Sequence, residues 1–89
     1  MDFEWDENKR MTNLNKHGID FEDVRIIFDG DTVTVEDDRY NYGEQRLVTF
    51  GFLRGSIVSV THTEYGDVIR VISARKATKH EQQLYLQQI

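Results

Sequence analysis

The sequence contains no cysteine and no proline, and it has no long apolar run. The lack of cysteine excludes a disulfide framework, a thiolate zinc site and thiol catalysis. No stretch approaches the roughly 18–20 apolar residues that a membrane-spanning helix needs. Residues 1–6 lack the basic start and the apolar core of a secretory signal peptide. The sequence therefore predicts a soluble, cytoplasmic protein that contacts no membrane.

The chain is too short for two domains of ordinary size. Its 89 residues are 38% hydrophobic and 11% aromatic, which is enough to form a core and too much for a disordered chain. We therefore expect a single domain that spans residues 1–89.

The net charge of −5, taken alone, argues against a polyanionic partner such as nucleic acid. The charge is unevenly distributed, because residues 1–45 carry a net charge of −8 and residues 46–89 one of +3. Such asymmetry is typical of a nucleic-acid surface or of an acidic half that pairs with a basic one. The alternative is that both halves simply carry solvated charge.

Capping residues mark the helices of the first third of the chain. Asp6 is a good N-cap and Gly18 suits the left-handed position after a helix, so residues 7–17 are predicted to be helical. Asp20 begins a second predicted helix, whose apolar residues recur on one face.

Period-two alternation predicts short strands at 3–5, 32–35, 48–52, 57–63 and 68–74, with a polar loop at 37–43. The short connections after residue 45 force neighbouring strands to be antiparallel. Thr78 and Glu81 match a capping box that starts a closing helix. The predicted class is α+β, with two N-terminal helices, an antiparallel meander of about four strands and a C-terminal helix.

Motifs for metal or cofactor binding are lacking. His17, His62 and His80 do not show the i, i+4 spacing of a helical metal pair. The acidic run at 36–38 could bind a divalent cation, although such a run is more typical of a solvated loop. A metal-dependent nuclease that uses His17 and this run is therefore a further alternative. The sequence contains no P-loop, no G-x-G-x-x-G and no G-x-S-x-G, and we predict neither a metal nor a cofactor.

Basic residues near the end of the last predicted strand are the most informative feature. Arg70 lies within an apolar strand, where a charge costs stability unless it faces water, a partner or an anion. Arg75 and Lys76 follow beside the start of the closing helix, and cations next to a helix N-terminus can form a phosphate site. The alternative is that these residues form ion pairs with acidic side chains.

His62 shares a predicted strand face with Val58 and Val60. It is therefore either a histidine at the edge of the core or a general acid–base group. The second interpretation depends on its ordinary pKa, which lies close to neutrality.

Four separated motifs, which span nearly the whole chain, resemble the BrnT family of bacterial toxins. They are Phe3-Glu4-Trp5-Asp6-x-x-Lys9, Asn13-x-x-Lys16-His17-Gly18-Ile19-x-Phe21, Gly43-Glu44-x-Arg46, and Arg70-Val71-Ile72-Ser73-Ala74-Arg75-Lys76-Ala77 with Glu81 and Tyr85 downstream. The resemblance implies a type II toxin with a RelE-like fold that cleaves RNA without a metal and stops translation. It also implies a BrnA-type antitoxin, a two-plus-two heterotetramer, and DNA binding only through the antitoxin.

The resemblance and the residue types together suggest roles for individual residues. Arg70 and Arg75 are expected at the scissile phosphate, and His62 is the best titratable candidate. The RNA backbone is expected to contact Arg46, Lys76 and Lys79. The acidic first half would weaken nonspecific RNA binding and so favours a substrate positioned on the ribosome.

The chain departs from the family pattern after the third strand of the meander. Family members often have Thr-x-Arg-Gly there, whereas this chain has Thr63-Glu64-Tyr65-Gly66. His80 and Gln82 also stand where arginines are common. Tyr65 could transfer a proton but cannot replace a fixed positive charge. The alternative function is therefore a weakly active or inactive member that mainly binds its antitoxin.

Overall fold

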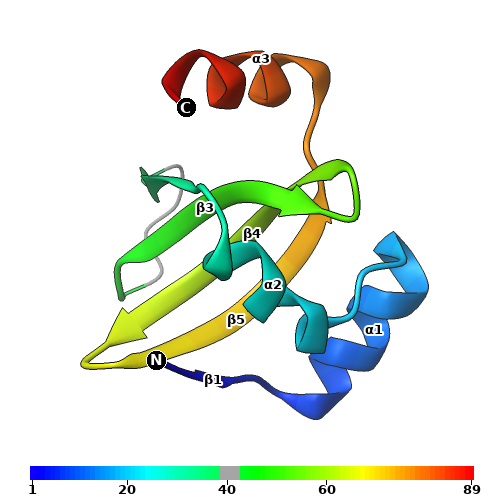
Figure 1. Ribbon diagram of the computed structural model, residues 1–89. Coiled ribbons are helices and arrows are strands. Elements are labelled where there is room, and N and C mark those ends of the chain that lie inside the picture. Colours follow the sequence, from blue (N-terminus) through cyan, green and yellow to red (C-terminus); the bar gives the residue numbers. More distant parts are fainter. Residues whose placement is uncertain (39–42) are drawn as a thin grey trace.

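The computed structural model describes residues 1–38 and 43–89, so residues 39–42 of the loop predicted at 37–43 lie outside the described residues, and Asp37 belongs to strand β2 (Val33–Asp37) rather than to that loop. The described elements form an α+β fold, as predicted (Figure 1). In chain order they are β1 (Asp2–Glu4), α1 (Glu7–His17), the 3-10 helix η1 (Phe21–Asp23), α2 (Val24–Asp29), β2 (Val33–Asp37), β3 (Arg46–Leu53), β4 (Ser56–Tyr65), β5 (Val68–Lys76) and α3 (Lys79–Gln88).

The sheet has the strand order β1-β5-β4-β3-β2. Strands β2 to β5 form the predicted meander, in which each strand pairs antiparallel with the next. The prediction of about four antiparallel strands is corrected in one respect, because β1 joins the sheet as a fifth strand and pairs parallel with β5. The pairing of β1 depends on how the rest of the chain folds, so no local pattern reveals it.

Local hydrogen bonds confirm the predicted helix ends. The Asp6 side chain accepts from the backbone N–H groups of Asn8 and Lys9, and Gly18 adopts a left-handed φ of 72°. Thr78 and Glu81 form both halves of the capping box of α3. The predicted second helix is divided, because Asp20 caps η1, which leads directly into α2.

The main hydrophobic core lies between one face of the sheet and the segment formed by η1 and α2. Phe21, Val24 and Ile27 are all at most 1% exposed. Helix α2 approaches β3 so closely that a Cβ on Gly51 would lie 2.7 Å from Cγ2 of Ile27. Glycine at position 51 therefore permits this packing.

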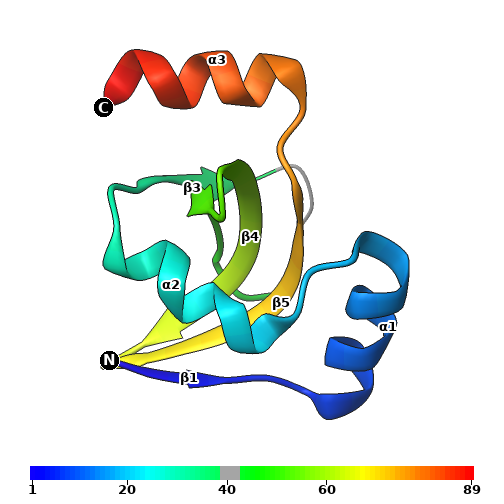
Figure 2. The same ribbon diagram turned by 45° about the vertical axis from the view of Figure 1, so that its right-hand side comes forward.

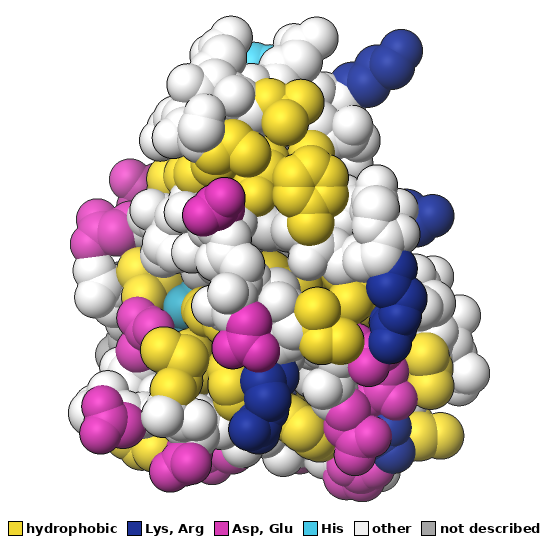
Figure 3. All heavy atoms as spheres, viewed as in Figure 1, with side chains coloured by type: hydrophobic (Ala, Val, Ile, Leu, Met, Phe, Trp, Pro, Cys, Tyr) yellow, Lys and Arg dark blue, Asp and Glu magenta, His cyan; other side chains and the backbone are white. Residues whose placement is uncertain are grey.

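The other two helices lie at different places on the sheet. Helix α1 runs beside β5, whereas α3 stands over the end of the sheet where β5 finishes (Figure 2). Tyr85 attaches α3, because its ring is 1% exposed and its hydroxyl donates to the Asp31 carbonyl oxygen at 2.7 Å. Figure 3 shows hydrophobic side chains gathered between α3 and the sheet. The sheet face opposite α2 is thus covered by α3 at one end.

Candidate functional site

Alternation along the strands assigns the two arginines of β5 to the sheet face opposite α2, which we call the open face. A bulge makes this possible, because Thr61 pairs with Ser73 and His62 pairs with Val71, leaving Ile72 as an extra residue. Val71 and Ala74 therefore both point into the core. The side chains of Arg70, Ser73 and Arg75 belong to the open face.

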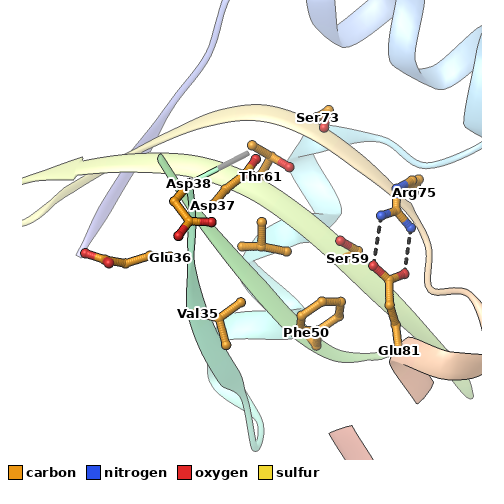
Figure 4. A pocket seen from close by; sticks show the side chains of 11 residues that line it. Val35, Glu36, Asp37, Asp38, Phe50, Ser59, Thr61, Ser73, Arg75 and Glu81 are labelled. Atoms are coloured by element: carbon orange, nitrogen blue, oxygen red, sulfur yellow. Dashed lines mark hydrogen bonds and ion pairs between the residues drawn. The ribbon is translucent and has the colours of Figure 1, made fainter. Parts of the chain in front are cut away.

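A hollow of about 330 Å³ occupies the open face beside α3. Figure 4 shows acidic side chains of β2 on one side of it and the Arg75–Glu81 pair on the other. The residues that line the hollow are Val35, Glu36, Asp37, Asp38, Val48, Phe50, Ser59, Thr61, Ser73, Arg75 and Glu81. Hydroxyl groups, one aromatic ring and charges of both signs thus converge in a space large enough for part of a nucleotide.

Arg75 lies at the rim of the hollow and is bound by Glu81 from α3. Its two terminal nitrogens donate to the two carboxylate oxygens at 2.8 and 3.0 Å. The Arg75 side chain is 35% exposed, so the pair remains in contact with solvent. The hydrogen bonds from Arg75 are the main reason why the pKa of Glu81 falls to about 2. Glu81 therefore stays ionised at neutral pH and places a carboxylate where Arg75 could otherwise hold a phosphate.

Arg70 and Tyr65 form a second polar cluster, around Glu4 of β1. Arg70 donates to one Glu4 oxygen at 3.3 Å, and the Tyr65 hydroxyl donates to the other. Tyr65 is 57% exposed. The predicted phosphate-binding arginines thus lie on the same face of β5, but each already has a carboxylate partner.

His62 lies on the opposite, core-facing side of β4. Its side chain is fully buried, its Nε2 shares a 2.7 Å hydrogen bond with Thr49 Oγ1, and its ring packs edge-on against Phe28. Burial lowers the pKa of His62. The structure thus places this histidine in the core and does not bring it together with Arg75. A role in proton transfer stays a prediction.

The three residues predicted to hold RNA backbone are dispersed. Arg46 begins β3 opposite Asp37. Lys76 ends β5 and Lys79 begins α3, and both are exposed. The lysines therefore lie at the α3 end of the sheet, and Arg46 lies toward the opposite end, where β3 begins.

Sequence reasoning did not identify the floor of the hollow. Ser59, Thr61 and Ser73 come together only because of strand register and the bulge. The partner of Arg75 had a sequence signal, since the capping box fixes Glu81 at the third position of α3, directly after β5.

Within residues 1–38 and 43–89, no three His, Asp or Glu side chains gather as a metal site would require. Among the same residues, the helices are too short or too polar to cross a bilayer.

Comparison with known proteins identifies the family. No curated protein matches the chain. The family model described as "Ribonuclease toxin, BrnT, of type II toxin-antitoxin system" matches residues 5–81, which include the arginines of β5 and the capping box of α3. The chain therefore belongs to the BrnT family of ribonuclease toxins of type II toxin–antitoxin systems.

Proposed function

We propose that this protein is an endoribonuclease that cleaves RNA without a metal and thereby inhibits translation. In the proposed reaction the ribose 2′-oxygen attacks the adjacent phosphorus and the bond to the 5′-oxygen breaks. The 2′-hydroxyl loses its proton and the departing 5′-oxygen gains one. The products are a cyclic phosphate and a 5′-hydroxyl. Positioning and charge stabilisation supply most of the catalysis in such a reaction.

The position of Arg75 carries this proposal. Arg75 stands at the rim of the hollow with both terminal nitrogens directed at two oxygens of one carboxylate. A phosphate presents two oxygens in a similar arrangement, so an RNA phosphate can take the place of Glu81. In this proposal, Arg75 stabilises the negative charge that develops on the phosphorus-bound oxygens.

Arg70 and Tyr65 are proposed to act on the same substrate. Arg70 would bind a phosphate after exchanging its exposed partner Glu4, and Tyr65 would transfer a proton. Of the two titratable candidates, Tyr65 is the accessible one, because His62 is enclosed between β4 and α2. Arg46, Lys76 and Lys79 are proposed to hold the RNA backbone.

We further propose the partners that accompany such an activity. The antitoxin is of the BrnA type, joins two toxins in a two-plus-two heterotetramer, and is the only component that binds DNA. The substrate is RNA positioned on the ribosome. The acidic residues of β2 beside the hollow support this choice, because they would weaken binding to free RNA.

Expression without an antitoxin tests the proposal. We expect growth arrest and loss of intact RNA, and we expect Arg70→Ala combined with Arg75→Ala to abolish both. Circular dichroism must show that the double variant is folded. A folded double variant that is as toxic as wild type would exclude these roles. Cleavage by the purified protein in excess chelator tests metal independence.

The second candidate function is a weakly active member that mainly binds its antitoxin. It is favoured by Tyr65, which stands where the family often has arginine, and by the ion pairs of both β5 arginines. Tyr65→Arg would restore the missing cation, so the weak-member proposal expects cleavage to rise from a low level. Robust cleavage by wild type at catalytic concentrations would exclude it.

A further inference from the structure

One face of α1 carries cations that have no role in the site described above. Lys9, Asn13, Lys16 and His17 follow the spacing i, i+4, i+7 and i+8, which brings them to one side of the helix. Asn13 is 6% exposed, whereas both lysines are exposed. Because Asn13 is buried, this side of α1 faces the rest of the protein.

Asn13 holds that face against β5. Its Oδ1 accepts from the Ala74 N–H at 3.1 Å, and its Nδ2 donates to the Ala74 carbonyl at 2.9 Å. The Nδ2 also donates to the Ile19 carbonyl at 3.0 Å, which ties the chain after α1 to the same point. Lys9 and Lys16, one turn before and after Asn13, therefore flank the edge of β5 at Ala74.

A groove of about 290 Å³ lies between this face of α1 and β5. Its most exposed cations are Lys9 and Lys16, with His17 beside them. None of the described residues that line the groove is acidic. Within residues 1–38 and 43–89 neither lysine forms an ion pair, in contrast to Arg70 and Arg75.

The groove and the hollow on the open face adjoin at Ser73. Ser73 lines both of them, and it lies two residues before Arg75 on the same strand. The bulge at Ile72 produces this junction, because Ile72 turns toward α1 while Ser73 joins the open face. A ligand that follows the groove past Ser73 therefore reaches Arg75.

We propose that this groove binds the RNA backbone next to the cleaved bond, with Lys9 and Lys16 contacting separate phosphates. The inference rests on the proposed ribonuclease function. Two helical turns separate the lysines by about 10 Å along the axis, which is too far for one phosphate. Lysine suits this role because it binds phosphate as a point charge that tolerates variable geometry. RNA is favoured over an acidic protein segment because the groove leads to the arginine proposed at the scissile phosphate.

Binding of a non-cleavable RNA tests the groove separately from catalysis. The probe is a single-stranded RNA in which every ribose is 2′-O-methylated, so that no nucleophile remains. The test variant is Lys9→Gln with Lys16→Gln. The control is Arg25→Gln with Arg54→Gln, which removes the same charge from exposed residues that do not line the groove. Affinity is measured from 50 mM to 300 mM salt.

Two lost phosphate contacts should make the slope of log K against log salt shallower by about 1.4. If the plots of log K against log salt for wild type and for the lysine variant meet near 1 M salt, the variant binds about 25-fold more weakly than wild type at 0.1 M. The control should stay within about threefold of wild type. Equal salt slopes for the test and control variants would overturn the proposal that the groove binds RNA. The absence of RNA binding by wild type would overturn it as well.

The two proposals fail in distinguishable ways. If wild type binds the probe through the lysines but cleaves no unmodified RNA, the ribonuclease mechanism fails while the groove stands. If the lysine variant loses antitoxin binding and keeps RNA binding, the groove belongs to an acidic partner and the inference is wrong. Unchanged cleavage and unchanged binding in the lysine variant would also refute it.

Discussion

Asn13 pairs with the backbone of Ala74 in the way that a neighbouring strand would. One side-chain amide supplies both an acceptor and a donor, and so satisfies the N–H and the carbonyl that β5 presents beyond the end of β1. A helix with few buried side chains is thereby attached to the sheet through hydrogen bonds. The same contact holds the cations of α1 beside the edge of β5 at Ala74.

Asn13→Ala should lower the free energy of unfolding by about 3 kcal/mol, because it leaves the buried backbone groups of Ala74 and Ile19 without their partner. Urea denaturation followed by circular dichroism measures the loss. Asn15→Ala, at an exposed position of the same helix, is the matched control and should change stability by less than about 0.5 kcal/mol. Similar losses in the two variants would contradict the strand-like role of Asn13.

The buried position of His62 predicts a pH dependence of stability. Burial lowers its pKa from the ordinary value of 6.5, so the folded protein resists protonation that the unfolded chain accepts. The contribution of neutral His62 to the free energy of unfolding is therefore fully present above pH 6.5 and is lost as the pH falls below that value. Urea midpoints between pH 7.5 and 5.5 should decrease for wild type and change less for His62→Gln. Parallel profiles would show that His62 titrates normally.

Glu81 predicts a separate dependence at lower pH. Its pKa is about 2 in the folded protein and near 4.5 without its partners, so its contribution is complete above pH 4.5 and is lost as the pH falls toward 2. Wild type should lose more stability than Glu81→Gln over this range. The comparison cancels the other carboxylates, which both proteins share. Equal losses would mean that Arg75 does not hold Glu81 in solution.

Sequence patterns predicted the parts of the fold that depend on interactions between residues close together in the chain. Asp6, Gly18 and Thr78 mark helix ends through hydrogen bonds and backbone angles within a few residues. The parallel pairing of β1 with β5 and the Arg70–Glu4 contact join opposite ends of the chain. Their partners could not be chosen from spacing alone.

The division of charge along the sequence also changes its meaning in the folded protein. Strand β2 belongs to the acidic first half, yet it contributes Glu36 and Asp37 to the hollow that contains Arg75. Lys9 and Lys16 belong to that same half, yet they line a groove without carboxylates. The packing of α1 and β2 therefore decides which surfaces of the protein are acidic and which are basic. Composition alone does not reveal this packing.

The most direct test is the initial rate at which purified protein cleaves messenger RNA on ribosomes, compared between Arg75→Gln and Glu81→Gln. Both variants break the same ion pair, but only the first removes the cation. If Arg75 stabilises the cleaved phosphate, Arg75→Gln should be slower than wild type by about 100-fold or more. Glu81→Gln should cleave at least as fast as wild type. Wild-type activity in Arg75→Gln, or an equal loss in both variants, would contradict the proposed mechanism.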